Sequence, residues 1–124
     1  MKLKSLNEET TVMSNSPNVQ NIDIEIADAK RAIKLQDMLQ RLKNNSDFKG
    51  LVEEAYFKEE ASNLIMGKAV PHLRGEDHQK VFDKRIIAIG EFRQWLSEVH
   101  AMGEISRKAL MDAEAVRDEI INEE

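Results

Sequence analysis

The chain contains no cysteine, only two prolines and only six aromatic side chains among its 124 residues. Without cysteine, neither a disulfide nor a thiolate metal site can form, and the composition is compatible with a reducing compartment. No apolar run approaches the roughly 20 residues of a membrane-spanning helix, so we expect no membrane partner. The scarcity of proline leaves long stretches in which nothing interrupts a helix.

The balance of charge is acidic, with 23 aspartates and glutamates against 18 lysines and arginines and a formal net charge of -5. Affinity for nucleic acid comes mainly from lysines and arginines that release counterions from the phosphate backbone. The acidic balance therefore argues against direct nucleic-acid binding. It leaves open a contact with a basic protein surface.

Signatures of catalysis and of ligand binding are missing as well. The chain has no Glu-x-x-His pair of the kind that holds two metals in a helical bundle, and no Gly-x-Ser-x-Gly elbow. It has no glycine-rich loop that could cradle a phosphate. His72 and His78 lie in one polar turn, but no third metal ligand has a predictable position. We expect no enzyme activity, no catalytic residue, no metal, no cofactor and no small-molecule substrate.

Local composition divides the chain into a polar N-terminal segment and a helical domain. Residues 1–21 are rich in Ser, Asn, Thr and Glu, and this composition predicts a flexible N-terminal arm. The remaining residues, 22–124, form the predicted helical domain. Apolar spacing, capping residues and Pro71 predict helices over residues 22–43, 48–69 and 77–122. The predicted fold is all-α, an elongated three-helix hairpin with a long C-terminal helix of coiled-coil type.

The last of these helices carries an apolar stripe with a mean repeat of about 3.5 residues, which favours packing against another helix in a supercoil. A helix from residue 77 to residue 122 would be roughly 70 Å long, too long for a compact domain of this size. The stripe therefore predicts a partner, and self-association into a homo-oligomer would provide one. Its members are Phe82, Ile86, Ile89, Phe92, Leu96, Val99, Met102, Ile105, Ala109, Ala113, Val116 and Ile120.

Within the stripe, we expect Leu96 and Ile105 to be central to an interface. Tyr56 and Phe57 are about 100° apart on a helix, so they are either an ordinary core pair or a second contact in which one ring faces a neighbour. Gly90 and Gly103, each costing about 1 kcal/mol of helix propensity, predict close helix approach or a bend. The predicted interface residues are Tyr56, Phe57, Phe92, Leu96, Val99 and Ile105.

Three strings, taken in order after an N-terminal helix, carry a resemblance to a known group of proteins. They read NSDFK from residue 45, EAYFKEEA from residue 54 and IAIGEFRQWL from residue 87. In this order the chain resembles small all-helical proteins encoded in the virion-structural region of tailed-bacteriophage genomes. The similarity extends over roughly residues 25–120 and leaves the N-terminal arm unmatched.

The resemblance implies a virion or assembly protein, found in the virion and assembled in the host cytoplasm. Its partners would be other copies of itself or other phage virion proteins, and it would act by self-association or docking. No catalytic residue is carried over by the resemblance. The alternative is a small phage-encoded acidic inhibitor that binds a host protein by mimicking the charge of nucleic acid.

Overall fold

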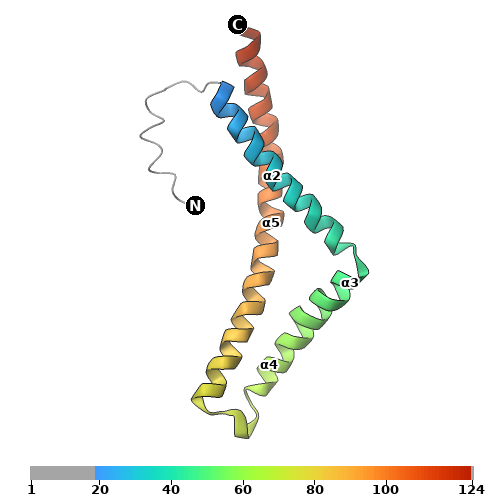
Figure 1. Ribbon diagram of the computed structural model, residues 1–124, viewed down its shortest axis with the longest axis vertical. Helices are drawn as coiled ribbons and strands as arrows, with labels where there is room; N and C mark the ends of the chain where they lie inside the picture. The colour runs from blue at the N-terminus through green and yellow to red at the C-terminus, as the bar shows by residue number, and fades with distance from the viewer. Residues whose placement is uncertain (1–18, 124) are drawn as a thin grey trace.

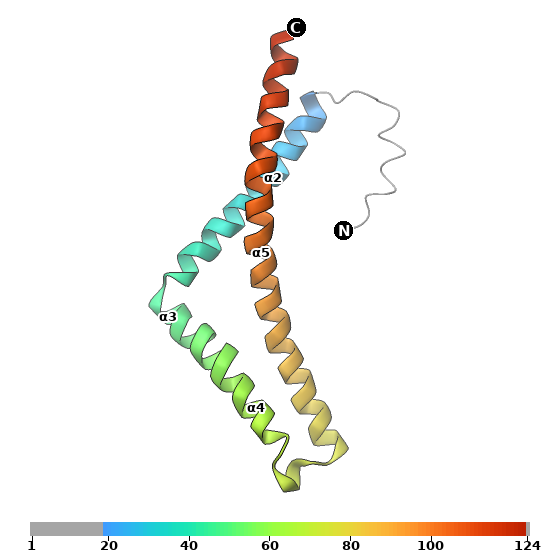
Figure 2. The same cartoon turned by 180° about the vertical axis from the view of Figure 1, so that it is seen from behind.

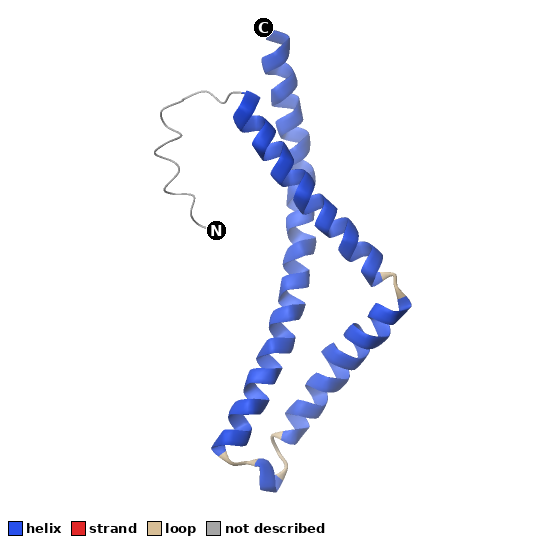
Figure 3. Ribbon diagram, in the orientation of Figure 1, coloured by secondary structure: helices blue, strands red, loops and turns tan. Residues whose placement is uncertain are grey.

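A computed structural model describes residues 19–123 of the chain, and this part is helical with no β-strand. The elements follow in the order α2 (Val19–Lys43), α3 (Ser46–Phe48), η1 (Lys49–Glu60), α4 (Ala61–Gly67), η2 (Pro71–Leu73) and α5 (Glu76–Glu123) (Figure 3). The predicted all-α fold with a long C-terminal helix is confirmed. Most of the predicted N-terminal arm, residues 1–18, lies outside the described residues, whereas residues 19–21 belong to α2.

The long helix α5 is the element on which the other helices pack. It contains 48 residues and is therefore roughly 70 Å long. α2 packs against its C-terminal half, whereas η1 and α4 lie against its N-terminal half. Figures 1 and 2 show α2 crossing α5, and they show α3 standing away from α5 at the vertex between α2 and η1. The chain thus forms an elongated hairpin in which one helix contacts two successive partners.

The corner between α2 and α3 is fixed by a helix cap. The backbone of Asn45 is extended. Its side-chain oxygen accepts a hydrogen bond of 3.0 Å from the backbone N–H of Phe48. A short polar side chain at this position satisfies one of the N–H groups that a helix start leaves free. The predicted break at residues 44–47 is where the chain turns.

The second corner, between α4 and α5, is set by Pro71. The preceding residue, Val70, has φ -68° and ψ 124°, because the proline ring disfavours helical geometry in the residue before it. The side chain of Gln79 donates hydrogen bonds to the carbonyl oxygens of Lys68 at 3.2 Å and Leu73 at 3.1 Å. These contacts tie the first turns of α5 to the end of α4 and to η2.

The segment predicted as one helix over residues 48–69 is a continuous helical rod over residues 46–67, but its central 12 residues, Lys49–Glu60, are π-helical. π-Helical turns are rare, and they occur mostly as single turns within α-helices. None of the 12 residues is buried. The rod therefore packs most closely on α5 at its α4 end, where Leu64 is buried and the Phe82 ring lies beside Gly67.

The core is a narrow seam between α5 and the two segments packed on it. Its buried apolar residues are Ile22, Ala29, Leu39, Leu64, Ile89 and Ala113, and Gln36, Gly103 and Ser106 are buried with them. Along α5, the buried face agrees with the predicted stripe at Ile89 and Ala113.

Between these two positions the buried face departs from the predicted stripe. Met102 and Ile105 are 52% and 61% exposed, whereas the neighbouring Gly103 and Ser106 are buried. The physical reason is that α2 crosses α5 too closely here for large side chains. A Cβ atom on residue 103 would overlap the side chain of Gln36. The predicted close helix approach is therefore found at Gly103, whereas a Cβ atom on residue 90 would meet no side chain and no other helix within 4 Å.

Candidate functional site

The crossing of α2 and α5 is built around one buried amide. Gln36, only 4% exposed, donates from Nε2 to a Glu104 carboxylate oxygen at 2.7 Å and to the His100 carbonyl oxygen at 3.2 Å. Its own amide oxygen accepts a hydrogen bond of 2.9 Å from Arg107 Nε. Among the described residues, no buried polar side-chain atom lacks a hydrogen-bond partner. A buried, fully satisfied amide in a helix pair fixes the register of the pair.

Two ion pairs support the same register, one at the crossing itself and one closer to the C-terminal end of α5. Arg107 donates to Asp37 at 2.8 Å, and Arg117 donates to Asp23 at 2.8 Å. Successive positions on α2 thus face α5 in reverse order, which shows that the two helices are antiparallel. Both pairs are about half exposed, so each stabilises the fold by no more than about 1 kcal/mol.

Three of the predicted interface residues form an aromatic cluster between η1 and α5. The ring centroids of Tyr56 and Phe57 are 6.0 Å apart. The ring centroid of Phe92 lies 6.4 Å from that of Tyr56 and 5.6 Å from that of Phe57. These separations fall within the range of favourable tilted ring contacts. Tyr56 and Phe92 are still 36% and 37% exposed. The cluster therefore links η1 to α5 and leaves Tyr56 and Phe92 partly exposed to solvent.

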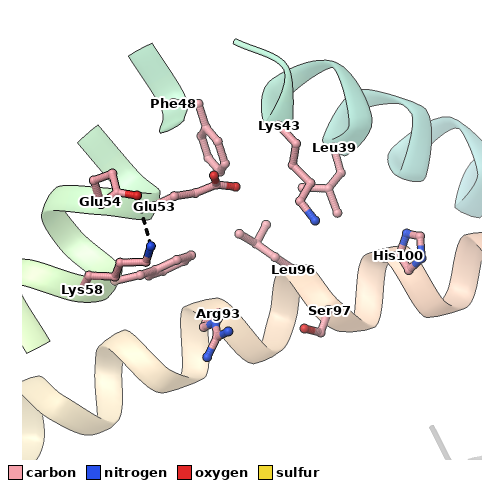
Figure 4. A pocket seen from close by; sticks show the side chains of 11 residues that line it. Leu39, Lys43, Phe48, Glu53, Glu54, Lys58, Arg93, Leu96, Ser97 and His100 are labelled. Atoms are coloured by element: carbon pink, nitrogen blue, oxygen red, sulfur yellow. Dashed lines mark hydrogen bonds and ion pairs between the residues drawn. The ribbon is translucent and has the colours of Figure 1, made fainter. Parts of the chain in front are cut away.

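Next to this cluster, a groove of about 490 Å³ opens between the end of α2, η1 and α5 (Figure 4). Its apolar lining includes Leu39, Phe57 and Leu96, and Figure 4 shows the Leu96 side chain directed into the space between the helices. Charged side chains share the lining, including Glu54 and Lys58, which form an ion pair of 3.1 Å. The groove is therefore mixed in character and has no cluster of like charge.

A second groove, of about 400 Å³, lies between α2 and α5 on the side where Trp95 and Met102 project from α5. Its lining is Asp28, Arg31, Ala32, Leu35, Trp95, Glu98, Val99 and Met102. Trp95, the single tryptophan of the chain, is 55% exposed, and Met102 is 52% exposed. Leu35 is 36% exposed on the facing helix. Large apolar side chains from α2 and α5 are thus exposed to solvent around the same groove.

On α5, this exposed patch is part of a longer series with a spacing of seven residues, which we call the Trp95 row. Its members are Ala88, Trp95, Met102, Ala109 and Val116. All five are exposed, including Val116 at 38%. Seven residues are close to two helical turns, so the row follows one side of α5 next to the face that α2 covers. A helix with a second apolar row of this kind is typical of packing against two neighbours.

The structure distributes the six predicted interface residues over different surroundings. Leu96 lines the mixed groove and Val99 lines the second groove, and both are half-buried. Ile105 is 61% exposed and lines neither of these grooves. Their role in an interface stays a prediction. Sequence analysis missed Trp95 and Gln36, although the spacing of seven from Trp95 to Met102 was a signal that could have identified the row.

Charge is unevenly distributed along the molecule. Residues 19–29 and 109–123, which lie together at one end (Figure 1), carry eight acidic side chains and one basic side chain. The opposite end, residues 68–85, carries five lysines and arginines, three acidic side chains and two histidines. The long axis of the hairpin thus joins a strongly acidic end to a moderately basic turn.

Three or more His, Cys, Asp or Glu side chains do not come together as a possible metal site anywhere in residues 19–123. Over the same residues, none of the helices is both long enough and apolar enough to cross a membrane.

No protein-family model, curated protein or solved structure matches the chain.

Proposed function

We propose that this protein is a non-enzymatic component of a larger assembly and that it acts by self-association or by docking on other proteins. The observation that carries the proposal is the Trp95 row, an exposed apolar series at coiled-coil spacing on a helix whose other face is already packed. Exposed apolar patches that extend beyond single side chains mark interaction sites in folded proteins. Association would cover this row and complete the burial of α5.

The shape of the molecule supports the same proposal. Only six apolar residues among the described ones are buried, whereas large side chains such as Ile87, Trp95 and Met102 are more than half exposed. A small, elongated chain buries little surface by itself, so contact with another chain supplies the burial that its own fold lacks. We propose a tailed-bacteriophage virion as the assembly, and this part of the proposal is supported by the three sequence strings alone.

The test is the molar mass of the purified protein, measured by light scattering across a dilution series at low and high salt. We expect an oligomer that persists in high salt, because contact between apolar side chains is not screened by ions. A monomer at every concentration and in both salts would overturn self-association. Screening against co-purified proteins of the same assembly then tests docking.

A second candidate function is supported by the acidic end. An inhibitor that mimics nucleic-acid charge would present a surface of this kind to a basic site on a host protein. Such binding weakens steeply as salt is added, because it depends on exposed charges. The salt dependence of the first partner identified therefore separates the two candidates: a complex stable in high salt supports the assembly protein, and one lost in high salt supports the inhibitor.

A further inference from the structure

We propose that the Trp95 row binds a second copy of this chain, and that the two α5 helices lie side by side and antiparallel about a two-fold axis near Val99. This inference rests on the proposed self-association and adds the surface, the occupant and the orientation. A two-fold axis brings the same patch of both copies together, so the patch must be complementary to itself. Three independent features of the described residues favour this arrangement.

The first feature is the position of the row beside an occupied face. α5 already packs against α2 through Val99, Gly103, Ser106 and Ala113, which follow one another at steps of four, three and seven residues. The Trp95 row lies beside this face, and Leu35 of α2 extends the apolar surface across the groove. A helix of the second copy that packs on this apolar surface would contact both α2 and α5 of the first. Two copies associated in this way would form a four-helix arrangement.

The second feature is the position of the groove along α5. The helix runs from Glu76 to Glu123, so its midpoint lies between Val99 and His100. Trp95 and Met102, which line the groove, lie on either side of this midpoint. An antiparallel pair centred here aligns the two α5 helices over their full length. It also places Trp95 of each copy against Met102 of the other, and a thioether next to an aromatic ring is a favourable contact.

The third feature is the distribution of charge. In an antiparallel pair centred near Val99, the acidic residues 109–123 of one copy lie beside the basic turn of the other, which includes Arg74, Lys80, Lys84 and Arg85. In a parallel pair, the two acidic ends would lie side by side and repel each other. Because like charges at close range select against a wrong orientation, the charge distribution favours the antiparallel pair.

The mixed groove near Leu96 does not offer an equivalent site. Its lining includes the charged side chains of Glu53, Lys43 and Arg93 as well as apolar ones. An apolar helix seated there would remove these charges from water, at a cost in free energy. The groove beside the Trp95 row has three charged side chains, Asp28, Arg31 and Glu98, against five in the mixed groove, so the same cost is smaller there.

The experiment uses single cysteines, since the chain has none of its own. Ala88 and Ala109 are exposed members of the Trp95 row at equal distances from a centre near Val99. In the antiparallel pair, residue 88 of one copy lies opposite residue 109 of the other, whereas the two copies of residue 88 are roughly 30 Å apart. The variants Ala88→Cys and Ala109→Cys are each oxidised alone, and are also mixed, equilibrated and oxidised together.

In the mixture, we expect covalent dimers that contain one copy of each variant. When either variant is oxidised alone, we expect only monomers. Non-reducing electrophoresis and mass spectrometry identify the products, and circular dichroism verifies that both variants keep their helices. Self-linked dimers of each variant would show a parallel pair and overturn the proposal. No linkage in any sample, with an oligomer in light scattering, would place the contact on another face, and the proposed self-association would stand. A monomer in light scattering would overturn both.

Discussion

Gln36 and Gly103 occupy the point at which α2 and α5 approach most closely. The backbone of residue 103 is so near to Gln36 that a Cβ atom there would overlap the glutamine side chain. The same glutamine is hydrogen-bonded to Glu104, His100 and Arg107, on either side of the glycine. A residue without a side chain and a fully bonded amide thus occupy one site, and each depends on the other.

Substituting the two glycines of α5 should have opposite effects on stability. Gly90→Ala should raise the free energy of unfolding by about 0.4–1 kcal/mol, because alanine favours the helix and no side chain or other helix lies within 4 Å of the new Cβ atom. Gly103→Ala should lower it by about 1–2 kcal/mol, because overpacking outweighs the same gain in helix propensity. Urea denaturation followed by circular dichroism measures both. Equal stabilisation by the two substitutions would contradict the close crossing.

The hydrogen bonds of Gln36 can be tested with a side chain of similar length. Gln36→Met removes the amide and should lower the free energy of unfolding by about 1–2 kcal/mol, because Glu104 and Arg107 lose a partner in a partly buried place. The matched control is Gln40→Met, at an exposed position one turn further along α2. Its effect should stay within about 0.5 kcal/mol. If both variants unfold at the same urea concentration, the network contributes nothing.

Neighbouring residues on α5 should separate folding from association. Leu96→Asp places a charge in the half-buried seam and should lower the stability of the hairpin by about 2 kcal/mol or more. Trp95→Asp alters an exposed position and should leave the unfolding of the monomer within about 1 kcal/mol of that of the parent. It should, however, abolish the oligomer in light scattering. An oligomer that survives Trp95→Asp would show that the Trp95 row is not the contact.

The single tryptophan also reports association directly. Trp95 is 55% exposed in one chain, so its fluorescence in dilute solution should resemble that of a solvent-exposed indole. On concentration, association should shift the emission to shorter wavelength and reduce quenching by acrylamide. Leu51→Ala, at a 71% exposed position on η1, is a control that should leave the concentration dependence unchanged. An emission spectrum that is independent of concentration, from a sample that light scattering shows to be associating, would place the contact elsewhere.

The π-helical segment should open more readily than the crossing. None of the residues Lys49–Glu60 is buried, whereas Gly103, Ser106 and Ala113 of α5 are. Because amide exchange through local opening is fastest where little surface is buried, the amides of η1 should exchange sooner than those of residues 99–113. Hydrogen exchange measured by mass spectrometry or by NMR tests this order. Equal protection in the two segments would show that they open as one cooperative unit.

Much of the fold could be predicted because the helices follow from local chemistry. Asn45 caps a helix, Pro71 stops one, and no proline interrupts residues 76–123, so both corners and the long helix are encoded near to where they occur. The π-helical geometry of η1 could not be predicted in this way. It depends on the hydrogen-bonding pattern of the backbone, and the apolar spacing of the segment does not distinguish this pattern from an α-helix.

The packing face was harder to predict because hydrophobicity selects large side chains and a close crossing requires small ones. On α5, Met102 and Ile105 have the stronger apolar character, but Gly103 and Ser106 are buried. On α2, Leu35 has the stronger apolar character, but its neighbour Gln36 is the buried residue, and the hydrogen-bond partners of Gln36 all lie on α5. Neither choice can be made without knowing where the two helices cross.

The uninterrupted length of α5 also sets the distance between the two ends of the molecule. Because no break divides its 48 residues, the helix holds the acidic end and the basic turn at one separation, roughly 70 Å, set by the number of residues alone. Inserting seven residues would lengthen it by roughly 10 Å and return the Trp95 row to nearly the same side, whereas inserting one residue would rotate half of the row by about 100°. Only changes of about seven residues in the length of α5 would therefore keep the Trp95 row on one side of the helix.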